Sequence, residues 1–189
     1  EFNPEKARAL LAQAGFPGGK GFPRLELMTT SREVQKTMAE AIQGMWKRHL
    51  GVHVDIRSCE WTAYKFAQNS MQYDFSSSSW SGDYLDPSSF LDLWSSASGN
   101  NNTGWSRPEY ERLLAESRAT GDQEKRMALL ARAEALMLSE SPVIPLYWAR
   151  RSYLKSPEVR GWHPLLLDNH LFEDISLGAP REQGKEAAP

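Results

Sequence analysis

Apolar residues in the first 80 positions recur at two spacings, every second residue and every third or fourth, and the two alternate along the chain. The first spacing is typical of strands and the second of helices. The pattern predicts six elements in this order: a helix over 3–14, a strand over 24–30, a helix over 31–51, a strand over 52–60, a helix over 61–72 and a strand over 73–80.

The first two predicted helices carry residues that favour helix ends. Asn3 is a capping residue, Pro4 suits the first turn, and Gly15 supplies a left-handed stop. Ser31 and Gly51 are expected to begin and end the longer helix in the same way. Apolar residues at helical spacing are expected to face the core: Leu10, Leu11 and Ala14 in the first helix, and Val34, Met38, Ala41, Ile42, Met45 and Trp46 in the second.

The order strand, helix, strand, helix, strand is typical of an α/β fold, a helix-covered and largely parallel or mixed sheet. In such sheets ligands bind beyond the carboxyl ends of the strands. The stretches TTSR (29–32) and SWSGDY (79–84) both follow a predicted strand. The binding site is therefore expected where these two stretches lie.

The remainder of the chain is mainly helical in pattern. We expect a short helix over 88–94, a polar loop over 95–106, helices over 106–117 and 122–141, and two short strands within 141–156. Residues 178–189 carry glycine, proline and charge without an apolar pattern, which predicts a disordered tail.

Composition narrows the classes of function. The net charge is −2, from 22 Lys and Arg against 24 Asp and Glu, which gives no broad basic surface for nucleic acid. The single cysteine, Cys59, excludes an intrachain disulfide and a zinc site with several thiolates. We find no apolar run of membrane-spanning length and no signal-peptide pattern. Because the chain enters a capped helix at once, we expect it to be a piece of a larger protein.

The chain carries candidate residues for catalysis as well as for binding. Asp83, Asp86, Asp92 and Glu60 could supply the two carboxylates that glycoside hydrolysis needs, but their separation is not encoded in the spacing. The serine run lacks a G-x-S-x-G motif, and His49 and His53 lack the spacing of a helical metal pair. Neither a catalytic residue, a metal nor a cofactor is therefore assigned.

The stretch SSSSWSGDYLDP (76–87) fits a binding site better. An ionised Asp83 would attract a cation such as a primary ammonium, and the rings of Trp80 and Tyr84 would add apolar contact or cation–π attraction. The small serines leave the backbone accessible. The alternatives are core packing for Trp80 and a turn or cap role for Asp83.

Three separated motifs carry a family resemblance: WSGDYLDPSSFLDLW (80–94), SGNNNTGWSRPEYERLL (98–114) and QEKRMALLARAEALMLSESPVIPLYW (123–148). In this order they resemble the C-terminal part of the dipeptide and oligopeptide class of ABC-transporter extracellular solute-binding proteins, and the likeness covers roughly residues 3–177. The resemblance implies a two-lobed protein that closes over extended peptide. Residues 1–157 would be its C-terminal lobe and 158–177 a segment returning toward an N-terminal lobe that this chain lacks, together with the leader.

The resemblance also implies partners and roles. The partners are peptides and a membrane permease, and the location is periplasmic or extracellular with a membrane anchor. Asp83 corresponds to the aspartate that pairs with the peptide α-ammonium, and the backbone of Ser79, Trp80 and Ser81 would pair with the peptide main chain. No enzymatic activity is implied.

Two departures from the family leave the ligand open. Some relatives have a cysteine after the motif tryptophan and an arginine before it, where this chain has Ser81 and Ser77–Ser79. Arg32 is the nearest substitute anchor for a peptide carboxylate. The family also includes binders of nickel, haem, opines and oligosaccharides, so a carbohydrate-binding or carbohydrate-active domain, favoured by seven tryptophans, stays as the alternative.

Overall fold

The computed structural model describes residues 2–150, 152–165, 167–168 and 170–178. They fall into two compact units. The first unit runs to Trp80 and also includes Leu93–Arg107, and the second consists of Ser81–Asp92 and the chain from Pro108 onward. The boundary therefore passes between two of the predicted site residues, Trp80 and Ser81.

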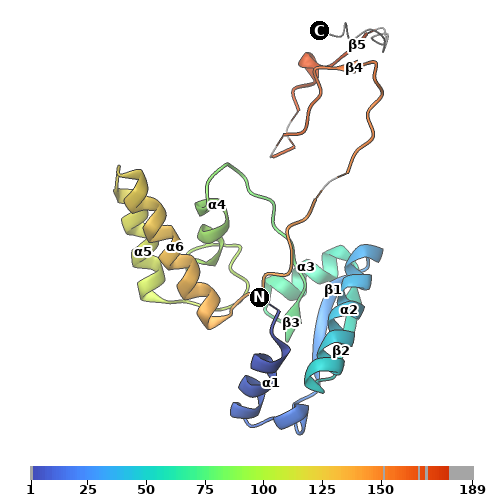
Figure 1. The fold of residues 1–189 in the computed structure, drawn as a ribbon, viewed down its shortest axis with the longest axis vertical. Coiled ribbons are helices and arrows are strands. Elements are labelled where there is room, and N and C mark those ends of the chain that lie inside the picture. The colour runs from blue at the N-terminus through green and yellow to red at the C-terminus, as the bar shows by residue number, and fades with distance from the viewer. Residues whose placement is uncertain (1, 151, 166, 169, 179–189) are drawn as a thin grey trace, which may run out of the picture. The chain divides into compact units, whose positions relative to one another are not determined.

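The first unit is built on a parallel sheet. Its strands are β1 (Leu25–Thr30), β2 (Val54–Cys59) and β3 (Phe75–Ser76), in the order β2-β1-β3 (Figure 1). Leu25 lies opposite Val54, and Leu27 lies opposite both Ile56 and Phe75. The α/β fold with a parallel sheet is confirmed. The third strand is much shorter than the predicted 73–80, since only two of its residues pair with β1.

The helices of this unit are α1 (Pro4–Gln13), α2 (Glu33–Leu50) and α3 (Trp61–Asn69), with a 3-10 turn η1 (Pro17–Gly19). The Asn3 side chain accepts a hydrogen bond from the Lys6 N–H at 2.9 Å, so the predicted cap of α1 is confirmed. The cap predicted at Ser31 is wrong. The Ser31 N–H donates to the Cys59 carbonyl at 2.9 Å and continues the strand pairing, and the extended Arg32 precedes α2 without a side-chain cap.

Two apolar clusters cover the two faces of the sheet. On one face Leu27 packs with Val54, Ala39 and Ile42, so α2 covers it, and on the other Met28 packs with Tyr64 and Ala67 of α3. The stripe predicted on α2 is too wide. Its core side follows Ala39, Ile42 and Trp46, whereas Val34, Ala41 and Met45 form a second, exposed stripe, with Val34 71% exposed. Leu10 of α1 is likewise exposed, while Leu11 packs on the core.

The second unit contains a helical pair. α5 (Pro108–Ala119) and α6 (Gln123–Glu140) lie side by side, and the short α4 (Ser88–Leu91) lies beside α6 (Figure 1). The Asp122 carboxylate caps α6 by accepting from the Lys125 N–H at 3.1 Å, as predicted. The buried hydrophobic side chains of the three helices are Leu91, Tyr110, Leu113, Leu114, Leu129, Leu130, Ala133 and Met137. A 3-10 turn, η2 (Asp92–Trp94), follows α4.

The strands predicted within 141–156 are wrong, because the described residues there form no strand. Pro142 and Pro145 have no N–H to donate to a strand partner. Two short strands lie further on instead: β4 (Val159–Arg160) pairs antiparallel with β5 (Ser176–Leu177), and η3 (Phe172–Asp174) precedes β5. The tail predicted to be disordered lies, from residue 179 onward, outside the described residues. None of the helices in the described ranges combines the length and apolarity needed to cross a bilayer.

Candidate functional site

The carboxyl ends of β1 and β3 form one edge of the first unit. The Ser77 N–H donates to the Met28 carbonyl at 2.9 Å, which extends the pairing one residue past β3. The Tyr64 hydroxyl of α3 then donates to the Ser77 carbonyl at 2.6 Å and lies 3.0 Å from the Ser76 hydroxyl. This polar contact fixes the direction in which the chain leaves the sheet. Ser79 and Trp80, the next residues of the predicted site, are both exposed.

Arg32 lies at the same edge of the sheet, because β1 and β3 are parallel neighbours and Arg32 follows β1 as Ser79 follows β3. The Arg32 side chain is exposed. Trp80 is 40% exposed, so it is not an ordinary core residue. Arg32 and the pair Ser79 and Trp80 therefore each follow a strand end at the same edge of the sheet.

The other predicted residues, Ser81, Asp83 and Tyr84, belong to the second unit, in the loop that leads to α4. The Asp83 N–H donates to the Ser89 hydroxyl at 2.7 Å, and the Tyr84 hydroxyl lies 3.2 Å from the Ser88 hydroxyl. The Asp83 carboxylate is exposed and forms no ion pair with another described residue. The turn role considered for Asp83 is thus performed by its backbone and not by its carboxylate.

Asp86 holds this loop to α6. Its Oδ1 accepts from the Ser88 N–H at 2.9 Å and the Ser88 hydroxyl at 2.7 Å. Arg126 donates to both carboxylate oxygens, each at 2.7 Å. The Arg126 hydrogen bonds hold the pKa of Asp86 well below its ordinary value, against the opposing effect of burial. Asp86 is therefore ionised at neutral pH, and its carboxylate is hydrogen-bonded to residues of its own chain.

The other carboxylates considered for catalysis are also engaged in local structure. Asp92 accepts from Arg118 of α5 at 2.7 Å, and Glu60 caps α3 by accepting from the Thr62 N–H at 2.7 Å. Of the four, Asp83 alone has a carboxylate that accepts no hydrogen bond from a described residue. Among the residues with described placement, no group of three or more His, Cys, Asp or Glu could hold a metal ion.

The polar loop over 95–106 is held by Asn101. Its side-chain N–H groups donate to the carbonyls of Trp94, Ser95 and Trp105 at 2.9–3.3 Å, and its Oδ1 accepts from both the N–H and the hydroxyl of Thr103. The Tyr73 hydroxyl donates to the Asn102 carbonyl. The side chain of Asn101 is therefore directed at its own loop.

The sequence did not reveal three residues that shape the Asp83 loop: Ser88, Ser89 and Arg126. The run Asp-Pro-Ser-Ser that begins at Asp86 carries a usable signal for the serines, because an aspartate commonly accepts from the backbone two residues on. Nothing local marks Arg126, which stands 40 residues from its partner Asp86.

Comparison with known proteins gives a consistent result. The family model of the bacterial extracellular solute-binding proteins, family 5 Middle, matches residues 1–102. The chain is 34% identical over 152 residues to the oligopeptide-binding protein OppA of Bacillus subtilis (strain 168), covering 80% of this chain and 28% of OppA. It is also 34% identical over 156 residues to the probable deoxycholate-binding periplasmic protein YgiS of Escherichia coli (strain K12), covering 82% of this chain and 29% of YgiS.

Solved structures agree with these relatives. The crystal structure of a periplasmic oligopeptide-binding protein, OppAIV from Borrelia burgdorferi, matches with a TM-score of 0.84 at 33% identity, over 93% of this chain and 36% of that one. The chain thus spans about a third of the length of the relatives it matches. The resemblance seen in the sequence is confirmed, whereas a carbohydrate-binding or carbohydrate-active domain receives no support. The relatives are binding proteins and not enzymes.

Proposed function

The chain belongs to the bacterial extracellular solute-binding proteins of family 5, and from this we propose that it is part of the substrate-binding component of an ABC importer for short peptides. The relatives named for oligopeptide binding support peptide as the ligand class. The complete protein would capture peptide between this lobe, residues 1–157, and an N-terminal lobe toward which 158–177 returns. A membrane permease would receive the peptide.

The observation that carries the proposal is the exposed Asp83 carboxylate. It stands on a loop whose backbone is fixed by Ser89, and no described residue neutralises it. A free carboxylate on an ordered loop is suited to pairing with a primary ammonium through charge-assisted hydrogen bonds. We assign Asp83 to the α-ammonium of the bound peptide.

The remaining contacts follow from the chain on either side of Asp83. The backbone of Ser79, Trp80 and Ser81 would pair with the peptide main chain, which makes recognition independent of peptide sequence. The exposed rings of Trp80 and Tyr84 would contact the first side chains. Arg32 would anchor a peptide carboxylate. The protein acts by binding and release, in the periplasm or at the outer face of the membrane, and performs no catalysis.

Titration calorimetry on the full-length protein tests this function. A short free-amino peptide should bind at least about tenfold more tightly than its N-acetylated form, since a hydrogen bond to a charged group contributes roughly 1.5–3 kcal/mol. Asp83→Asn should remove most of this preference. Asp122→Asn is the matched control, because asparagine caps a helix as well as aspartate does, and it should bind both peptides like the wild type.

Two further ligands define the contrary outcome. Deoxycholate and an oligosaccharide, titrated under the same conditions, should give no saturable heat. Tight binding of deoxycholate with none of peptide would assign the chain to a different ligand class within its family. Equal affinity for free and acetylated peptide would remove Asp83 from the ammonium site.

A further inference from the structure

Residues 81–92, which comprise the Asp83 loop, α4 and Asp92, bond to the α5–α6 pair at three places among the described residues of the second unit. Arg126 of α6 binds Asp86, the buried hydroxyl of Tyr110 donates to the Leu91 carbonyl at 2.7 Å, and Arg118 of α5 donates to Asp92 at 2.7 Å. Two of these attachments lie at or beyond the end of α4. Only the Asp86 attachment lies on the same side of α4 as Asp83.

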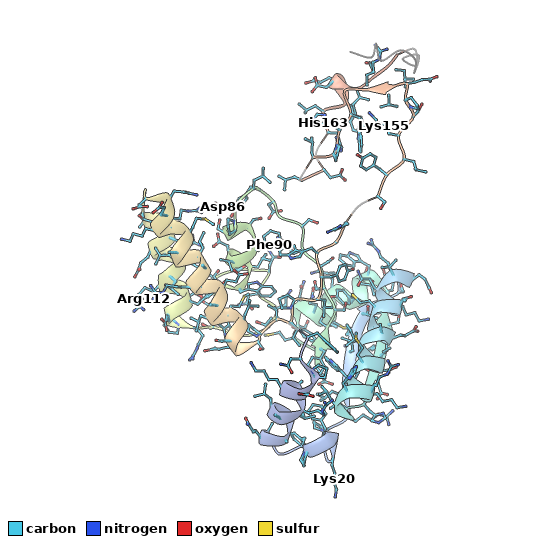
Figure 2. All side chains as sticks on the ribbon, in the orientation of Figure 1. Lys20, Asp86, Phe90, Arg112, Lys155 and His163 are labelled. Atoms are coloured by element: carbon cyan, nitrogen blue, oxygen red, sulfur yellow. The ribbon has the colours of Figure 1, made fainter. Side chains whose placement is uncertain are left out.

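Asp86 and Arg126 form a bidentate ion pair, which constrains both side chains. Both carboxylate oxygens accept from the guanidinium at 2.7 Å, and the two side chains are only 24% and 21% exposed. A planar fork on a carboxylate fixes orientation as well as distance. Figure 2 shows Asp86 at the α4 side of the helical pair, while Arg112 lies on its opposite side.

A short series of hydrogen bonds connects this ion pair with Asp83. Asp86 Oδ1 accepts from Ser88, the Asp86 carbonyl accepts from the Ser89 N–H at 3.0 Å, and the Ser89 hydroxyl accepts from the Asp83 N–H at 2.7 Å. The hydroxyl of Ser88 also lies 3.2 Å from that of Tyr84. Movement of Asp86 would therefore reach both Asp83 and Tyr84 through two serines.

We propose that Arg126 is a positioning residue for ligand recognition: through Asp86 and Ser89 it holds the backbone at Asp83 and so sets the position of the Asp83 carboxylate. The proposal rests on the proposed function, because it takes Asp83 as the partner of the peptide ammonium. In this proposal Arg126 acts through Asp86 and does not contact the ligand. It determines how strongly the protein distinguishes a free amino end from a blocked one.

The readout is the ratio of the dissociation constants of N-acetylated and free-amino peptide, measured by calorimetry on the full-length protein. Arg126→Met should lower this ratio about fivefold or more, because a displaced carboxylate loses most of a charged hydrogen bond. The affinity for acetylated peptide should stay within about twofold. Arg126→Lys keeps the charge but loses the fork, and should restore the ratio only in part.

The matched control is Arg112→Met on α5, whose guanidinium pairs with Glu109 and Glu116 of its own helix. It should leave the ratio unchanged. If Arg126→Met weakens both peptides equally, or if Arg112→Met lowers the ratio as much, Arg126 is only a structural residue and the proposal is wrong. A wild-type ratio near one rejects the proposed role of Asp83, whereas a high wild-type ratio kept by Arg126→Met rejects the positioning role alone.

A measurement without ligand covers the case in which Arg126→Met folds poorly. Asp86→Asn keeps an oxygen acceptor for Ser88 but loses the charge that Arg126 binds. In this variant the amide hydrogens of residues 81–92 should exchange about tenfold faster, while those of β1 and β2 should be unchanged. Faster exchange in the strands as well would indicate general destabilisation, and unchanged exchange in the loop would overturn the proposal.

Discussion

Asp86 and Asp83 are three residues apart and have opposite surroundings. Asp86 is shielded and accepts four hydrogen bonds, from Arg126 and Ser88, whereas Asp83 is exposed and its carboxylate accepts none from described residues. A paired carboxylate contributes to stability, and a solvated one is available to a ligand. The same residue type thus has a structural role at Asp86 and, in the proposed function, a binding role at Asp83.

The pH dependence of stability should reveal the Asp86 pair. The pKa of Asp86 is lowered in the folded protein by Arg126. Its stabilising contribution is therefore complete above the ordinary aspartate pKa of about 3.9 and is lost as pH falls through the folded pKa. Asp86→Asn should lower the free energy of unfolding by about 1–3 kcal/mol at pH 7, and the difference from wild type should shrink at pH 3. Urea unfolding at the two pH values measures it.

Asp83→Asn is the control for that series. Removing an exposed carboxylate should change the free energy of unfolding by less than about 0.5 kcal/mol at either pH. A difference between wild type and Asp86→Asn that is the same at pH 3 and pH 7 would contradict the pair's contribution.

Asn101 gives a second test at the level of single residues. Asn101→Ala removes five hydrogen bonds within the loop and should cost about 2–3 kcal/mol, lowering the melting temperature by roughly 5 °C or more. Peptide affinity should change less than stability. Asn100→Ala is the matched control, since Asn100 bonds Ser98 through its backbone N–H. A loss of affinity without a loss of stability would place the loop in the binding site.

Among the secondary-structure elements, the ends of α1 and α2 show how helices are stopped in two settings. Both are followed by a glycine with positive φ, Gly15 at 95° and Gly51 at 68°. A Cβ on Gly15 would meet nothing within 4 Å, whereas a Cβ on Gly51 would lie 2.3 Å from the Gly18 carbonyl oxygen. The end of α2 is therefore also a close contact between two backbone segments.

Alanine at the two glycines should separate these causes. Gly15→Ala should cost about 1–2 kcal/mol, the strain of a left-handed residue with a side chain. Gly51→Ala should cost roughly 1–3 kcal/mol more, because the backbone near Gly18 must move. Thermal unfolding of the two variants measures the difference. Equal losses of stability in the two variants would mean that the backbone at Gly18 can move away from the new Cβ without cost.

The helix ends could be predicted from the sequence because capping acts over three or four residues. Asn3 and Asp122 cap as expected, and Gly51 ends α2. The cap predicted at Ser31 is wrong because the Ser31 N–H donates to Cys59 at the end of β2. No local sequence pattern contains this long-range hydrogen bond. The strands predicted within 141–156 are wrong for a related reason. A strand forms only where a second strand pairs with it, and the local pattern does not show whether such a partner is present.

The candidate site shows the same limit. Asp83 and Trp80 could be proposed from the sequence because their motif is local, and both stay predictions. The sequence offered Asp86 as a candidate carboxylate for catalysis, whereas in the structure it bonds Ser88 and Arg126. A contact across 40 residues is decided by how α6 packs, and no spacing rule encodes that.

On the scale of the whole molecule, the segment after α6 is unusually apolar for an exposed stretch. Trp148 is 84% exposed, and Ile144, Leu146, Tyr147 and Leu154 are exposed as well. A run of exposed apolar side chains of this kind is typical of an interface. In the proposed two-lobed protein this segment and residues 158–177 would pack against the N-terminal lobe.

The chain alone should therefore bind peptide poorly and associate with itself. With only one lobe present, Asp83 stays exposed to water, where an ion pair contributes about 0–1 kcal/mol. This is too little to offset the entropic cost of ordering a flexible peptide. Calorimetry should give a dissociation constant no better than about 1 mM, and sedimentation velocity should show oligomers that Trp148→Ser reduces. Micromolar peptide binding by a monomeric chain would contradict the proposal that this chain supplies only one side of the binding site.

The bond between Asp86 and Arg126 also fixes an order of events during synthesis. The ribosome releases residues 81–92 before Tyr110, Arg118 and Arg126, the three residues that hold them. Until Arg126 is added, 40 positions after Asp86, the Asp86 carboxylate lacks this partner, although the residues of β1, β2 and β3 have already been synthesised. Pairing of Asp86 with α6 is consequently a late step, and a nascent chain interrupted before Arg126 would contain Asp83, the proposed ligand residue, without the ion pair that holds its loop.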